Sequence, residues 1–277
     1  MSISAKDVKE LREKTGAGMM DCKKALTEAD GDMEKAIEIL RKKGQKVSEK
    51  RADREANQGL ILTRISDDGK KAAAIEINCE TDFVARNEDF QKKAETFLDA
   101  AFENEVSSLD ELLKTEVDGL TIEDHLKDMV GKIGEKIEIS RVIFSKSEGT
   151  FVDYIHPGNQ LGVLVEFAGD VDSESVGKDI AMQIAAMNPL AVNRDSVDSS
   201  VIDKELEIAK EQLINEGKPA EIAEKAAQGK LRRFYEERVL LEQKYVKDNG
   251  ITVRELLEKE NAPTVVSFHR MQLGENS

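Results

Sequence analysis

The chain has 277 residues with 41 Lys and Arg against 56 Asp and Glu, which gives a formal net charge of −15. Charged residues make up 35% and hydrophobic residues 39%, with no tryptophan, a composition that favours several small cores and solvated helices over one deep core. No apolar run approaches the roughly 18 residues of a membrane-spanning helix. The strong acidity also argues against a role built on binding the phosphate backbone of nucleic acids.

The chemistry-bearing residues are few and scattered. Cys22 and Cys79, with three histidines, give neither a disulfide framework nor the spacing of a zinc site. The sequence contains no phosphate-binding loop, no Gly-x-Ser-x-Gly elbow and no nucleophile–base pair. We therefore expect no enzyme activity, no cofactor and no metal. The first residues contain neither a secretory signal nor an Arg-rich import leader, so we expect a cytoplasmic protein.

The first 55 residues differ in charge from the rest. They carry a balance of +2 and the remaining residues −17, which predicts a module boundary at residue 55. Apolar spacing predicts three helices in this module: one after Ser4, one over residues 21–29 and one after a turn at residues 30–32. Gly44, within a run of Lys and Arg, predicts the end of the third helix and the start of a polar tether.

Met19 and Met20 follow a glycine-rich break at residues 16–18. Flexible, polarizable methionine side chains beside such a loop suit adaptable contacts with another protein. The alternative is that they belong to the small core of the module, and we expect this of one of the two.

The body after residue 55 contains a faint repeat. Residues 59–65 and 72–77 are apolar runs joined by Ser-Asp-Asp-Gly, a hairpin signal, and two amphipathic helices and a strand follow. The order recurs after residue 150, where residues 151–155 and 161–167 flank His-Pro-Gly-Asn. Each half reads β-β-α-α-β, so we expect an α+β fold.

These halves predict two related core subdomains, over residues 56–145 and 146–277. The second is interrupted at about residues 198–248. Apolar residues spaced three and four apart from Ile202 to Leu213 and from Ala227 to Tyr245, with Arg238 as a charged interruption, predict an antiparallel helical hairpin resembling a coiled coil. The hairpin either packs against the body or protrudes as an interaction arm.

The most unusual segment is residues 79–87, which read CETDFVARN at the end of a predicted strand. Thr81 and Asp82 are residue types that cap helices. Residue types alone therefore favour a capped helix start with Phe83 packed back onto the core.

The same segment resembles the signature of the elongation factor Ts family, the nucleotide-exchange factors for elongation factor Tu in bacterial translation. Three further stretches are similar to that family and occur in the right order: LREKTGAGMMDCKKAL at residues 11–26, HPGNQLGVLV at 156–165 and GKPAEIAEK at 217–225. The resemblance covers nearly the whole chain. It implies that residues 1–55 form a three-helix module similar to a ubiquitin-associated domain.

The resemblance implies contacts with elongation factor Tu at three places. In order along the chain, these are the module residues Leu11, Arg12, Met19 and Met20, the segment Asp82, Phe83, Val84 and Ala85, and the second-subdomain residues His156, Gly158 and Leu161. In the family the phenylalanine wedges in near the Mg²⁺ site of the partner, and its segment is associated with dislodging the ion. The expected partner is elongation factor Tu, GDP-bound and nucleotide-free, with no direct nucleic-acid or membrane contact.

Two other hypotheses come from different functional classes. One is an adaptor that uses the first module to hold an unrelated protein, and the other is an enzyme whose site has no recognisable motif. One departure from the family also matters: many members continue into a further C-terminal helix, whereas this sequence ends with LGENS at residues 273–277. The resemblance therefore implies no role for such a helix here.

Overall fold

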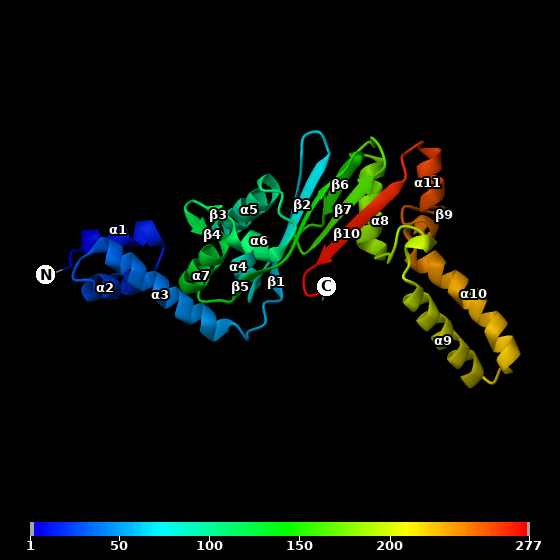
Figure 1. The fold of residues 1–277 in the computed structure, drawn as a ribbon, viewed down its shortest axis with the longest axis horizontal. Helices are drawn as coiled ribbons and strands as arrows, with labels where there is room; N and C mark the ends of the chain where they lie inside the picture. Colours follow the sequence, from blue (N-terminus) through cyan, green and yellow to red (C-terminus); the bar gives the residue numbers. More distant parts are fainter. Residues whose placement is uncertain (1–2, 276–277) are drawn as a thin grey trace.

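The computed structural model describes residues 3–275 and mixes helices and strands, consistent with the predicted α+β class. The molecule is elongated, as Figure 1 shows. Three N-terminal helices lie at one end, strands lie in the middle, and a helical hairpin extends from the other end. Among the described residues, no helix has the length and apolar character needed to cross a membrane.

The N-terminal unit consists of α1 (Ala5–Thr15), α2 (Met19–Glu28) and α3 (Met33–Arg51). Ser4 and Asp7 form a reciprocal capping box that starts α1, and the Asp32 side chain caps α3. The small core of the unit includes Leu11 and Leu26, both with no exposed surface.

The prediction of a helix end and a polar tether at Gly44 is wrong, because α3 continues to Arg51. Gly44 is buried where α3 crosses α7 (Ile122–Ile133), and a Cβ on Gly131 of α7 would lie 2.6 Å from its Cα. The two backbones are in contact, so packing outweighs the cost of about 1 kcal/mol for a glycine inside a helix. Because α3 also pairs with the body through Arg51 and Glu80, 2.7 Å apart, it joins the N-terminal unit firmly to the body.

Two three-stranded antiparallel sheets form the centre of the molecule. Sheet 1 has the order β1-β2-β5, and sheet 2 has the order β6-β7-β10 when read from its first strand. Their bounds are β1 Gln58–Ile65, β2 Lys71–Cys79, β5 Ile137–Lys146, β6 Thr150–Ile155, β7 Leu161–Phe167 and β10 Val265–Gln272. In each sheet a hairpin comes first and a strand that returns after helices joins its second strand.

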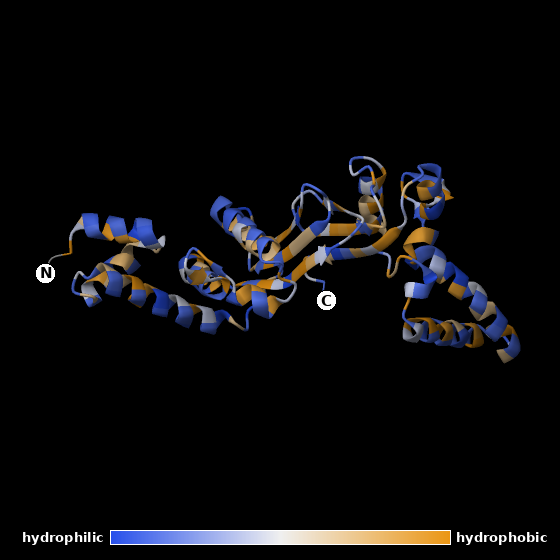
Figure 2. Ribbon diagram, turned by 45° about the horizontal axis from the view of Figure 1, so that its top comes forward, coloured by the Kyte–Doolittle hydropathy of each residue, from blue (hydrophilic) through white to orange (hydrophobic). Residues whose placement is uncertain are grey.

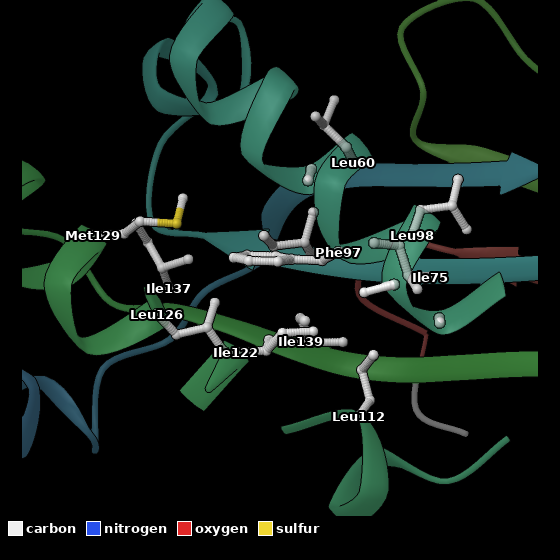
Figure 3. Close-up of a cluster of buried hydrophobic side chains, with 14 of the residues drawn as sticks. Leu60, Ile75, Phe97, Leu98, Leu112, Ile122, Leu126, Met129, Ile137 and Ile139 are labelled. Carbon is white, nitrogen blue, oxygen red and sulfur yellow. The ribbon is translucent and has the colours of Figure 1, made fainter. Parts of the chain in front are cut away.

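Helices cover the outer face of each sheet. Sheet 1 packs against α4 (Asp82–Ala85), α5 (Glu88–Glu103), α6 (Leu109–Lys114) and α7, around Phe97, Ile75 and Ile139 (Figure 3). The small hairpin of β3 (Glu116–Val117) and β4 (Leu120–Thr121) precedes α7. Sheet 2 packs against α8 (Val176–Met187) and α11 (Val253–Lys259).

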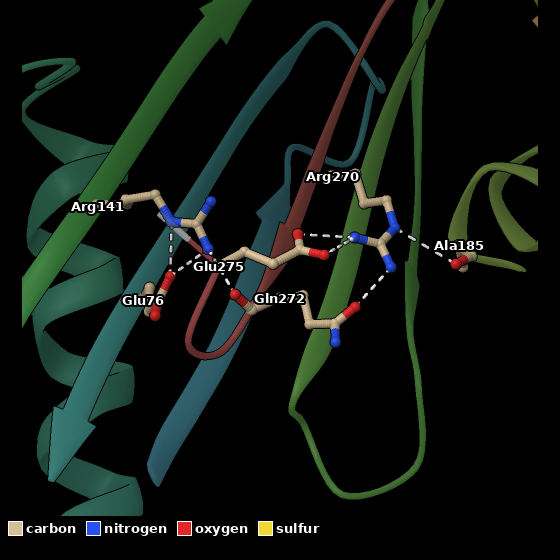
Figure 4. Close-up of polar contacts among 6 residues, drawn as sticks. All are labelled: Glu76, Arg141, Ala185, Arg270, Gln272 and Glu275. Atoms are coloured by element: carbon tan, nitrogen blue, oxygen red, sulfur yellow. Dashed lines mark hydrogen bonds and ion pairs between the residues drawn. The ribbon is translucent and has the colours of Figure 1, made fainter. Parts of the chain in front are cut away.

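The inner faces of the two sheets pack on each other. Ala72 and Ala74 of β2 meet Phe151, Leu164 and Met271 of sheet 2, so β2 is buried on both faces. An ion pair between half-buried Arg141 and buried Glu76 reinforces this contact. Arg141 donates to Glu76 over 2.6 Å and, through a second nitrogen, to the Gln272 carbonyl oxygen over 2.9 Å (Figure 4). The molecule is therefore layered helix, sheet, sheet, helix, and the strands are largely hydrophobic (Figure 2).

The predicted hairpin is present as α9 (Ser199–Asn215) and α10 (Ala220–Arg238), and it protrudes from the body (Figure 1). Its seam is short, built from Ala209, Leu213, Ala223 and Ala227. The prediction that the seam continues to Tyr245 is wrong. The helix ends at Arg238, and Leu241 and Tyr245 pack in the core of sheet 2, because the chain after α10 bonds to residues 190–192 instead.

Short elements complete the second half of the body. They are η1 (Arg194–Ser196), η2 (Leu240–Glu242), β8 (Lys244–Tyr245) and β9 (Asp248–Thr252). Thr252 and Glu255 form a capping box at the start of α11.

Candidate functional site

The segment from Asp82 to Ala85 forms the single-turn helix α4 directly after β2. Thr81 caps the helix, with its hydroxyl accepting from the Val84 N–H over 3.4 Å. Ala85 is buried and Val84 half-buried against the core of sheet 1, and Asp82 pairs with Arg86 over 3.1 Å. The turn thereby directs the remaining side chain of the helix, Phe83, away from the core.

Phe83 is 83% exposed, so the alternative in which it packs back onto the core is wrong. Among residues 3–275, every other phenylalanine and tyrosine side chain is buried or half-buried. An exposed phenylalanine forgoes the roughly 1.5–3 kcal/mol that burial of such a side chain provides. The free energy is available to any partner whose surface encloses the ring.

The N-terminal unit offers a second apolar surface. Met19 and Met20 are 60% and 64% exposed, so the expectation that one lies in the core is wrong. Helix α2 begins at Met19, earlier than predicted, which places both methionines in its first turn, ahead of the buried face formed by Cys22, Ala25 and Leu26. Arg12 is exposed on α1.

Leu11 and Ala85 do not share this exposure. The Leu11 side chain lies wholly inside the N-terminal core, and Ala85 is 7% exposed. Both side chains support the neighbouring surface residues and present almost no area to a partner.

A cleft of about 870 Å³ separates the N-terminal unit from the helices of sheet 1. Phe83 and Val84 line one side, and the loop of residues 15–17, just before Met19, lines the other. Six cationic and three acidic side chains line it, an excess of positive charge in an acidic protein. The cations are Lys14, Arg41, Lys43, Lys92, Lys93 and Lys132.

Two carboxylates that sequence reasoning missed hold the turn before α4. Glu135 accepts from Thr81 twice, from the N–H over 3.1 Å and from the hydroxyl over 2.8 Å. Glu80 accepts from the Lys136 N–H over 2.6 Å and from Arg51 over 2.7 Å. These bonds hold the pKa of Glu80 below its usual range, the Lys136 N–H having the largest effect. Their only sequence signal is an acidic residue beside each predicted strand end.

Cys79 lies beneath this turn and is buried, with its Sγ 3.2 Å from the Thr81 carbonyl oxygen. Burial, together with the neighbouring Glu135, raises the pKa of its thiol to about 12. The thiol is therefore protonated at neutral pH and is not an activated nucleophile. Within the part of the chain that the structure describes, no three His, Cys, Asp or Glu side chains are grouped to hold a metal ion.

The third set of predicted residues lies in the turn between β6 and β7. His156 is exposed, and its Nδ1 is 2.8 Å from the Tyr154 hydroxyl. Gly158 adopts a φ of +95°, which favours glycine, and Leu161 packs half-buried against the core of sheet 2. The Asn159 carbonyl oxygen accepts from the Ile61 N–H over 2.7 Å, tying the turn to β1.

The structure therefore brings some of the predicted residues together and leaves others apart. Phe83 and the loop before Met19 share one cleft, which His156 does not line. The turn that contains His156 contacts the first half of β1. Because the start of β1 pairs with the end of β2, where α4 begins, this turn lies toward the same end of the sheets as α4.

An elongated α+β protein with exposed apolar side chains on a terminal helix unit, on a single-turn helix and on a protruding hairpin has the surface of a protein-binding factor. Comparison with known protein families identifies which family of such factors the chain resembles. The family model described as Elongation factor TS matches residues 80–275. The chain belongs to the elongation factor Ts family, and it is a translation elongation factor.

Individual relatives agree along the full length. The elongation factor Ts of Christiangramia forsetii is 49% identical over 275 residues, covering 98% of this chain and 99% of the relative. That of Prosthecochloris aestuarii is 48% identical over 284 residues, with 98% and 99% covered. That of Amoebophilus asiaticus is 47% identical over 277 residues, with 99% and 100% covered.

Proposed function

We propose that this protein is a guanine-nucleotide exchange factor that binds elongation factor Tu·GDP, disturbs its Mg²⁺ and phosphate site, and promotes GDP release so that GTP can load. Family membership supplies the context. The observation that carries the proposal is the exposure of Phe83, 83% solvent-accessible on a capped turn at the rim of a cleft.

The mechanism needs binding energy and no covalent chemistry. Mg²⁺ demands near-ideal octahedral geometry, so displacing one supporting element of its site weakens it sharply. If Phe83 fits a pocket that exists only in the opened partner, its burial favours that state by about 2 kcal/mol. By linkage, a factor that prefers the nucleotide-free partner weakens GDP binding by the same ratio, and GTP in turn releases the factor.

Three surfaces would share the contact. Arg12, Met19 and Met20 would dock the N-terminal unit, and the segment from Asp82 to Val84 would act at the nucleotide site. The turn with His156, Gly158 and Leu161 would meet a further part of the partner, while Leu11 and Ala85 would act as supports. Since the first two surfaces are joined through α3, binding of one raises the effective concentration of the other.

We further propose that residues 1–55, 56–145 and 146–277 act as three units, with the hairpin of α9 and α10, residues 199–238, as a separate arm in place of the predicted 198–248. The site of action would be the cytoplasm, where translation takes place, without direct contact to nucleic acid or membrane. No cofactor would be needed, since the exchanged nucleotide and its Mg²⁺ belong to the partner.

Stopped-flow release of a fluorescent GDP from purified elongation factor Tu tests this function. The wild-type protein accelerates release, and Phe83→Ala lowers the stimulated rate about 30-fold, the equivalent of about 2 kcal/mol. Val266→Ala, which truncates another exposed side chain, 51% accessible, on β10, serves as the control and leaves release unchanged. Absence of any acceleration by the wild-type protein would overturn the proposal.

The adaptor hypothesis differs in one measurable respect. It rests on the exposed Met19 and Met20 alone, so it predicts that their joint replacement by Ala abolishes every interaction while Phe83→Ala changes nothing. Because the partner of such an adaptor is an unrelated protein, calorimetric titration of elongation factor Tu separates the two hypotheses: the exchange factor binds it and loses affinity with Phe83→Ala, whereas the adaptor does not bind it at all.

A further inference from the structure

Helix α4 is a single turn of four residues, too short to be stable on its own. Its exposed Asp82–Arg86 pair provides little, since such surface pairs contribute about 0–1 kcal/mol. Phe83 makes no core contact, and the Thr81 cap is long at 3.4 Å. Within the helix, only the packing of Val84 and Ala85 on the core of sheet 1 sets which side of the turn faces outward. The backbone that enters the turn must therefore be held from outside the helix.

Glu135 supplies that external support from the turn between α7 and β5, just after Gly134, the left-handed cap of α7. One of its oxygens accepts from the Thr81 N–H and fixes the backbone that leads into α4. The other accepts from the Thr81 hydroxyl, which is 2.8 Å away. Because that hydroxyl proton is directed at Glu135, an oxygen lone pair is left to accept from the Val84 N–H.

Glu80 adds a reciprocal contact between the same two turns. Its carboxylate accepts from the N–H of Lys136, the residue next to Glu135, and from Arg51 at the end of α3. Residues 80 and 81 are thus bonded to residues 136 and 135. We call Glu80 and Glu135 the two-carboxylate clamp, and through Arg51 it also connects to the N-terminal unit.

We propose that Glu135 is a positioning residue for Phe83: by holding Thr81 at two atoms it keeps α4 formed and the aromatic ring presented to the partner. This inference rests on the proposed function for the role of Phe83. Its structural part, the ordering of α4 by Glu135, holds in the free protein and can be tested without a partner.

The first experiment measures amide hydrogen exchange of residues 82–87 in the free protein. Glu135→Ala speeds exchange there by about tenfold or more, because the segment opens locally once its anchor is lost. Glu135→Gln retains an oxygen that accepts from the Thr81 N–H, and its amide group can donate to the Thr81 hydroxyl. The exchange rate of residues 82–87 in this variant therefore stays near that of the wild type. Unchanged exchange in Glu135→Ala overturns the proposal, whatever the partner does.

The matched control is Glu138→Ala. It removes the same charge three residues along, where Glu138 pairs only with Lys136 over 3.0 Å and does not contact Thr81. Exchange of residues 82–87 in this variant stays at the wild-type rate. Equal effects of Glu138→Ala and Glu135→Ala would show that charge alone matters and would contradict the proposal.

The second experiment uses GDP release and a double-mutant cycle. Glu135→Ala lowers the saturating stimulated rate about tenfold and Glu135→Gln restores most of it, whereas in a Phe83→Ala background Glu135→Ala causes little further loss. An equal loss in both backgrounds would mean that Glu135 acts elsewhere. If the wild-type protein fails to accelerate release, the proposed function falls, and the exchange result still decides whether Glu135 orders α4.

Discussion

Sheets 1 and 2 have the same strand order, yet the chain behaves differently where the second strand of each ends. After β2 it turns into α4 and exposes Phe83, whereas β7 ends on Phe167, which has no exposed surface. The second half departs again between α8 and α11, where the hairpin is inserted. The repeated scaffold supplies the cores, and the exposed features arise where the repeat is broken, as expected when a rigid frame carries variable loops.

The largest loss of unfolding free energy should come from truncating the core phenylalanines, in contrast to Phe83. Phe97→Ala and Phe167→Ala each remove a fully buried ring from one half and should cost about 3–5 kcal/mol of unfolding free energy. Phe83→Ala should change that free energy by about 0.5 kcal/mol or less, as exposed positions do. Chemical denaturation followed by circular dichroism measures all three, and a destabilisation by Phe83→Ala similar to that by Phe97→Ala would refute the distinction.

A smaller loss of unfolding free energy is expected from Gly162→Ala, which tests the contact between the two sheets. A Cβ at Gly162 of β7 would lie 2.5 Å from a methyl carbon of Ile61 in β1. Overpacking of this kind costs about 1–3 kcal/mol. Thermal melts of Gly162→Ala alone and combined with Ile61→Ala check it: if the cause is this contact, the two changes are far from additive.

Removal of the hairpin should lower the stability of the protein by a smaller amount. It also removes the main insertion that distinguishes the second half from the first. Replacing residues 199–238 with a short flexible linker removes a seam that is separate from the other cores. We expect the melting temperature to fall by only about 2–4 °C, equivalent to about 1 kcal/mol for a chain of this size. Loss of the cooperative transition would show instead that the arm is part of the body.

The smallest change in unfolding free energy is expected from replacing Glu80, and this change depends on pH. Its pKa is lowered in the folded state, so its charge stabilises the fold above the unfolded pKa of about 4.3, and this contribution is lost as the pH falls through the folded value. The difference in unfolding free energy between wild type and Glu80→Gln should therefore be largest near neutrality and shrink on acidification below that value. Denaturation at a series of pH values measures it; a constant difference would contradict the assignment.

Much of the fold could be predicted because its signals are local. The hairpin turn at residues 66–69, the buried face of α5 and the capping boxes each depend on residues a few positions apart. The N-cap character of Thr81 was also readable. A single turn has no periodicity that shows which side is buried, so residue types alone gave the wrong direction for Phe83, and the family resemblance gave the right one.

Two of the errors and one omission involve partners distant in sequence. Gly44 was predicted as a helix end because the contact that requires a glycine there, the close approach of Gly131, comes from another helix. Tyr245 fitted the heptad spacing of the hairpin although its core partners lie around sheet 2. Glu135 escaped notice because Thr81, its partner, is 54 positions away. Such contacts become visible only once the chain is folded.

The path of α3 has a consequence for how the chain folds as it is synthesised. Its first half, with Ala36 and Leu40, can pack on α1 and α2 as soon as these residues leave the ribosome. Gly44, in the second half, meets Gly131 only after α7 has been made. The N-terminal unit therefore emerges before α7, the packing partner of the second half of α3, has been made. That half can dock only after roughly half of the polypeptide exists, so the final packing of the N-terminal unit depends on the folding of the region that follows it.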